Sequence, residues 1–226
     1  MITRDNYELV YEGLLRELSG VDLSRVSENI GVVYQGDQLE MNFLGKSYRI
    51  SNQGIWELNE KAPNVAIRIV LCHYVLQAGQ GNLTGEWMSY RDFKDSAFFI
   101  SNFQANVEER IAQNFSGRAS DLGRAARELD GEPFEGFQTG DVCYYFQALP
   151  KVPILLVFYD KDAEFPASCK VLFDKSSSTW LDMECLAVLG WILADLLIKI
   201  SHRHTQTYTD ISLTEHTQNR RVILNL

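Results

Sequence analysis

The chain has 226 residues, of which 46% are hydrophobic and 23% are charged, and its formal net charge is −9. A chain of this length buries roughly 70% of its surface on folding, so it needs no disulfide or metal to hold a core together. The acidic balance argues against a nucleic-acid partner, because duplex binding depends on basic patches.

Helical and strand patterns alternate through residues 1–80. Apolar side chains recur at three- and four-residue spacing over 5–18, which predicts an amphipathic helix. Short alternating patterns then predict three antiparallel strands, at 32–34, 38–43 and 46–51. A second, strongly apolar helix is predicted over 65–78.

The second half repeats this kind of pattern. Helices are predicted over 97–115 and 121–129, the latter with Ser120 as its N-cap. Three strands follow, at 143–148, 154–159 and 169–173. The strand at 154–159 is almost wholly apolar, which predicts a central strand covered on both faces. A last helix is predicted over 183–200.

The order of elements in residues 1–80 and 97–200 is similar. In each half a three-stranded meander, a tryptophan and an apolar helix follow one another, which suggests an internal duplication. The predicted fold is α+β, with mostly antiparallel strands in two three-stranded meanders and helices packed against them. Residues 1–200 would form a single domain, made of these two similar halves if the duplication is real, and 201–226 a loosely attached C-terminal extension.

No targeting or membrane segment is expected. Charged residues stand where a secretory signal would be apolar, and the most apolar stretch, 185–194, is about half of the roughly twenty residues that a bilayer crossing needs. The four cysteines lie far apart without a Cys-x-x-Cys pair. We therefore expect reduced, buried thiols in a cytoplasmic protein and predict no metal site.

Histidines occur in two places that could carry chemistry. Cys72 and His73 are neighbours in a predicted helix, where consecutive side chains diverge, so a core cysteine beside a partly exposed histidine is expected. His202 and His204 stand two residues apart, with His216 further along. Two such imidazoles share a face only in an extended strand, so this is a weak pattern for a metal site.

Acidic residues gather around the edges of the second predicted sheet. The carboxylates there could hold a hard cation or act as acid and base, and they belong to Asp160, Asp162, Glu164, Asp174, Asp182 and Glu184. A solvated rim is the alternative interpretation, because Lys161 and Lys175 lie among them.

An aromatic segment with one arginine follows the glycine-rich loop at 79–85. It contains Trp87, Tyr90, Arg91 and Phe93. An arginine beside aromatic rings can clamp a carboxylate or phosphate while the rings stack on a flat ligand. Anchoring of the loop on the core is the alternative.

Two segments resemble a known family. One runs from Leu149-Pro-Lys-Val-Pro through Asp160 to Ser168, and the other is Trp87-Met-Ser-Tyr-Arg-Asp-Phe followed by a long helix. They are similar to the prokaryotic domain of unknown function family DUF3786, which is common in anaerobes, and the resemblance extends from about Tyr7 to Leu197. The family brings no assigned activity.

The resemblance also implies positions and a partner. The positions that match are Tyr90, Arg91, Asp160, Glu164, Phe165, Pro166 and Asp174. Some relatives are joined to a cysteine-rich segment similar to that of corrinoid iron–sulfur proteins. This chain has no cysteine cluster, so an iron–sulfur or corrinoid group would have to come from a partner protein.

Three function hypotheses follow. The first is a cytoplasmic module that binds a small molecule or cofactor in anaerobic metabolism, in a cleft between the halves. Its predicted ligand-binding residues are Tyr90, Arg91, Asp160, Glu164, Phe165 and Asp174. The second is an enzyme in which the three acidic residues of this set supply acid–base or divalent-cation chemistry. The third is a structural or partner-binding protein with an apolar patch near 222–226. The cofactor and the oligomeric state stay open.

Overall fold

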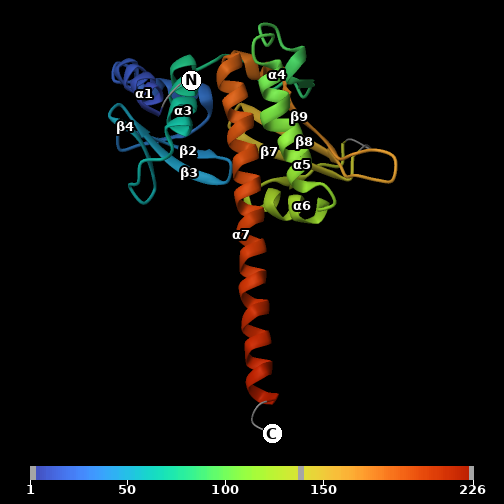
Figure 1. Cartoon of the computed structure of the whole chain (residues 1–226). Coiled ribbons are helices and arrows are strands. Elements are labelled where there is room, and N and C mark those ends of the chain that lie inside the picture. Colours follow the sequence, from blue (N-terminus) through green and yellow to red (C-terminus); the bar gives the residue numbers. More distant parts are fainter. Residues whose placement is uncertain (1–3, 137–139, 224–226) are drawn as a thin grey trace.

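Two antiparallel sheets, each followed in the chain by an apolar helix, organise the computed structural model (Figure 1). It describes residues 4–136 and 140–223, and the packing of side chains within 6–136 and 140–204. The predicted α+β class with antiparallel sheets is confirmed.

The first half forms a four-stranded meander in the order β1-β2-β3-β4. Its elements are α1 (Arg4–Leu18), α2 (Leu23–Ile30), β1 (Val33–Gln35), β2 (Gln38–Phe43), β3 (Lys46–Ser51), β4 (Gly54–Glu57) and α3 (Val65–Gln77). The sequence analysis missed two of them. One is α2, which Asp22 caps by accepting from the N–H groups of Ser24 and Arg25. The other is β4, whose four residues are too few to show an alternating pattern.

The second half forms a five-stranded sheet in the order β5-β9-β8-β7-β6. Its strands are β5 (Trp87–Ser89), β6 (Glu132–Pro133), β7 (Val142–Leu149), β8 (Val152–Tyr159) and β9 (Ser168–Asp174). The predicted central strand is confirmed, because β8 lies between β7 and β9 and is buried from Val152 to Phe158. Each sheet thus has more strands than the three predicted, and the two added here, β5 and β6, are short edge strands.

The helices of the second half differ from the prediction in detail. They are η1 (Tyr90–Asp92), α4 (Ile100–Phe103), the π-helical η2 (Gln104–Glu109), α5 (Arg110–Phe115), α6 (Ala119–Glu128), η3 (Lys175–Thr179) and α7 (Met183–Ile223). The prediction that Ser120 caps a helix is wrong, because α6 already begins at Ala119. The Asp160 carboxylate accepts from the Ala119 N–H at 3.3 Å, so the helix start is capped by a side chain distant in sequence.

Helix α7 is longer than predicted and extends away from the two sheets (Figure 1). It runs in the direction opposite to α3 and contacts both α3 and α6. The first turn of the predicted loose extension is packed against the body, since Ser201 is buried and accepts from Arg118 Nη2 at 2.7 Å. The side chain of His216 and the predicted apolar patch at 222–226 lie outside the described side chains.

One continuous cluster of buried residues includes members of both halves, among them Leu39 in β2, Val70 in α3, Leu156 in β8 and Leu193 in α7. Within the part of the chain that the structure describes, no helix has the length and apolarity that a bilayer crossing requires.

Candidate cleft between the two halves

An open cleft of about 830 Å³ lies where the two halves meet. One wall comes from the hairpin of β2 and β3 and the start of α3, and the other from the end of α6 and residues 196–203 of α7. Its apolar lining consists of Phe43, Leu44, Tyr48, Ile67, Leu129, Leu196 and Ile200. The volume falls within the range of about 300–1,000 Å³ typical of small-molecule sites.

The turn between β2 and β3 fixes one wall of the cleft. Gly45 has a φ of +74°, in the left-handed region that favours glycine. A Cβ at this position would lie 2.9 Å from the backbone carbonyl carbon of Leu129. The hairpin therefore approaches the end of α6 as closely as backbone allows, and a larger residue would push the two walls apart.

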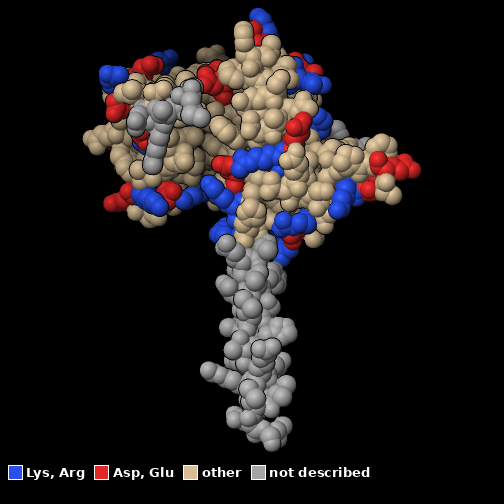
Figure 2. Space-filling view, in the orientation of Figure 1, with Lys and Arg blue, Asp and Glu red and all other residues tan. Residues whose placement is uncertain are grey.

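Charged residues surround the apolar lining. Lys46 pairs with Glu57 at 2.7 Å, and Glu128 pairs with Arg203 at 3.4 Å and with His204. Lys199 is exposed at the cleft and forms no hydrogen bond or ion pair within the described part of the chain. Figure 2 shows basic side chains gathered where the first half meets α7. The cleft lining thus holds three basic side chains, Lys46, Lys199 and Arg203, against the two carboxylates of Glu57 and Glu128, in contrast to the net charge of −9 of the whole chain.

Tyr48 contributes a phenol to the cleft wall. Burial and then the nearby Glu57 carboxylate raise the pKa of Tyr48 to about 12. The phenol is therefore protonated at neutral pH, where it can both donate and accept a hydrogen bond.

Tyr90 anchors its segment on the core. Its ring is buried and stacks on Phe103 with centroids 4.2 Å apart, and its hydroxyl donates to the Met183 carbonyl at 2.7 Å. Arg91 beside it is exposed. The two residues line a hollow of only about 10 Å³, which is about the space that one water molecule needs.

Asp160, Glu164 and Phe165 lie at one end of the hairpin formed by β8 and β9. Asp160 accepts from the N–H groups of Ala119, Gly117 and Lys161. Burial alone would raise its pKa, but these bonds outweigh burial and lower it. Glu164 is exposed, and Phe165 is 66% exposed.

Asp174 lies at the opposite end of β9, and the residue is 1% exposed. It accepts five hydrogen bonds, from the backbone and hydroxyl groups of Thr84 and Ser176 and from the Gly85 N–H. Seven strand residues, or roughly 20 Å, separate it from the end that holds Asp160. The three predicted acidic residues therefore do not converge. They do not form one site in which they could act together as acid and base.

Sequence analysis did not find the basic residues of the cleft. Lys199 is the second-last residue of the helix predicted over 183–200, and Arg203 lies three residues beyond its end. Had the helical spacing been continued, Leu196, Lys199 and Arg203 would have been placed on one face of α7. Lys46 offers no such signal, because only tertiary packing brings its hairpin to this face.

A family model described as "Domain of unknown function (DUF3786)" matches residues 22–196. Neither the curated proteins nor the solved structures contain a match to this chain.

Proposed function

The chain belongs to the DUF3786 family, whose description names no activity, and we propose from its geometry that it is a module that binds a small anionic molecule with an apolar part. The site is the cleft between the two halves. The observation that carries this proposal is the unpaired Lys199 beside an apolar lining.

The ligand class follows from the chemistry of the walls. A carboxylate, sulfonate or phosphate group would pair with Lys199, and the rest of the ligand would bury apolar surface against Leu129, Leu196 and Ile200. Each Å² of apolar surface removed from water contributes about 25 cal/mol. The other cations of the cleft already have carboxylate partners, so Lys199 is the group that gains most from an anion.

The cellular setting is part of the same proposal. All four cysteines are free thiols, as is usual for proteins of the reducing cytoplasm. An iron–sulfur or corrinoid protein partner in anaerobic metabolism, which the family resemblance implies, stays a prediction.

Lys199→Glu is expected to weaken binding of the anionic, apolar dye 8-anilinonaphthalene-1-sulfonate by about thirtyfold, because charge reversal turns an attraction of about 1 kcal/mol into a similar repulsion, a change of about 2 kcal/mol. Fluorescence titration measures the dissociation constant. Lys94→Glu is the matched control, since Lys94 is exposed and lies outside the cleft. Equal dye affinities of the two variants would refute the proposed site.

Two further variants separate this site from the one predicted around Arg91. Ile67→Trp fills the cleft and is expected to reduce dye binding, whereas Arg91→Ala is expected to leave it unchanged. Loss of binding in Arg91→Ala with retention in Ile67→Trp would instead favour the Tyr90 and Arg91 segment. Native mass spectrometry of the purified protein and of Lys199→Glu tests whether a co-purified molecule occupies the same cleft.

A further inference from the structure

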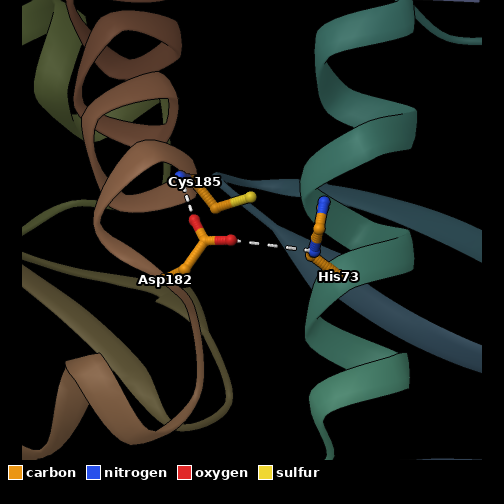
Figure 3. Close-up of side chains that lie close together, drawn as sticks. All are labelled: His73, Asp182 and Cys185. Atoms are coloured by element: carbon orange, nitrogen blue, oxygen red, sulfur yellow. Dashed lines mark hydrogen bonds and ion pairs between the residues drawn. The ribbon is translucent and has the colours of Figure 1, made fainter. Parts of the chain in front are cut away.

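Three side chains with metal-binding atoms meet where the C-terminal part of α3 faces the start of α7. They are His73 from α3, Asp182, which directly precedes α7, and Cys185 from the first turn of α7 (Figure 3). Their candidate ligand atoms all lie within 4.8 Å of one another. Figure 3 shows the Asp182 carboxylate and the Cys185 sulfur on the side of α7 that faces His73.

Asp182 approaches both of the other members of this cluster. One carboxylate oxygen of Asp182 accepts from the Cys185 N–H at 2.7 Å, which holds the carboxylate at the N-terminus of α7. The other oxygen lies 4.0 Å from His73 Nδ1. Asp182 therefore has one oxygen engaged in capping the helix and one directed toward the histidine.

We propose that His73, Asp182 and Cys185 bind a divalent transition-metal ion, for which Zn²⁺ is the best match. Imidazole nitrogen, carboxylate oxygen and thiolate sulfur are the three donor types that proteins offer to zinc. A thiolate and a carboxylate together balance the charge of the ion, and the thiol proton passes to solvent when the metal binds. Three protein ligands leave a fourth tetrahedral position for water or another molecule.

The distances allow such a site after a small movement. Zinc–ligand bonds of about 2.0–2.3 Å place tetrahedral ligand atoms roughly 3.5 Å apart, so the cluster would contract by about 1 Å. The side chains of Asp182 and His73 are 52% and 30% exposed, which leaves them room to turn toward a bound ion. Cys185 is buried, so its side chain has less room to move than the other two.

A free cysteine nucleophile is a weaker interpretation of the same cluster. Burial, followed by the charge of Asp182, raises the pKa of Cys185. The thiolate that a nucleophile needs is therefore scarce in the metal-free protein. The prediction of a partly exposed His73 beside a buried Cys72 is confirmed, but the sequence did not indicate that His73 faces Asp182 and Cys185.

Titration of the folded protein with Co²⁺, followed by displacement with Zn²⁺, tests this site. Wild-type protein is expected to bind one equivalent of Co²⁺ and to show a sulfur-to-cobalt charge-transfer band. Cys185→Ser should lose this band, and His73→Ala should weaken Zn²⁺ binding at least tenfold. Cys143→Ser and His202→Ala are the matched controls, because they remove a thiol and an imidazole outside the cluster.

Several outcomes would overturn the site. They are a wild-type protein that binds no Co²⁺ at micromolar concentrations, a charge-transfer band that persists in Cys185→Ser, and a band that disappears in Cys143→Ser. Circular dichroism establishes that each variant is folded. If Cys185→Ser is not folded, His73→Ala decides the matter, because His73 is only half-buried and its loss leaves the buried core intact. Lys199→Glu should retain the metal, which keeps this test separate from that of the cleft.

Discussion

Asp174→Ala is expected to destabilise the protein by about 4 kcal/mol, because five hydrogen-bond donors lose one buried carboxylate. Those donors belong to the loop that precedes β5 and to the start of η3, so the carboxylate joins two segments distant in sequence. Urea denaturation followed by circular dichroism measures the free energy of unfolding. The variant would be as stable as the wild type only if water replaced all five bonds.

Glu164→Ala is the matched control for this substitution. It also removes a carboxylate beside the second sheet, but Glu164 is exposed and no hydrogen bond of its side chain is present among the described residues. Its effect is expected to stay within about 0.5 kcal/mol. A similar loss of stability in both variants would show that net charge, rather than the network around Asp174, determines the effect.

The same network predicts how stability depends on pH. Burial alone would raise the pKa of Asp174, but hydrogen bonds from Ser176, Thr84 and Gly85 outweigh it and hold the pKa below the ordinary value of 3.8. The ionised carboxylate therefore stabilises the folded state fully above pH 3.8, and this contribution is lost as the pH falls through the lower folded-state pKa. Asp174→Asn should flatten this acid-side decrease in the free energy of unfolding, and an unchanged slope would contradict the assignment.

Gly79→Ala is expected to destabilise the protein by about 3 kcal/mol. A Cβ on Gly79 would lie 2.2 Å from the Thr179 carbonyl oxygen and 2.9 Å from its carbonyl carbon. Both atoms belong to the backbone, so neither can move aside as a flexible side chain would. The change would push the end of α3 away from η3, next to the buried Trp180.

Gly13→Ala provides the comparison for Gly79→Ala. Gly13 lies within α1, and the nearest atom to a Cβ there is the end of the Arg16 side chain at 4.0 Å. Alanine favours a helix over glycine by roughly 0.5–1 kcal/mol, so this variant should be as stable as the wild type or slightly more stable. Thermal and urea unfolding should thus show a loss of stability in Gly79→Ala and none in Gly13→Ala, and equal losses in both would contradict the close contact at Gly79.

Periodicity predicted the long elements because each of them is specified by its own residues. The apolar spacing of α3 and the continuous apolar run of β8 identified both elements to within a few residues. Edge strands were missed for the opposite reason. β5 and β6 have three and two residues, and they are strands only because β9 and β7 offer them hydrogen-bond partners.

The candidate sites show the same limit more strongly. Asp160 and Asp174 were selected as acidic residues near a sheet, but the donors that surround them come from Gly117, Ala119, Thr84 and Gly85, which no local pattern connects to them. A capping carboxylate and a catalytic one look alike in a sequence. Only the hydrogen-bond donors that surround the carboxylate in the folded structure distinguish the two roles.

Hydrophobic spacing along the sequence was enough to predict the α+β class, the positions of the main helices and strands and the burial of β8, because this spacing acts over a few neighbouring residues. The tertiary structure alone decided which residues meet across the halves. The antiparallel packing of α3 against α7 places His73 beside Cys185 at one end and Ile67 beside Lys199 at the other. Such contacts depend on how whole helices and sheets pack together, which the spacing of residues along the chain does not indicate.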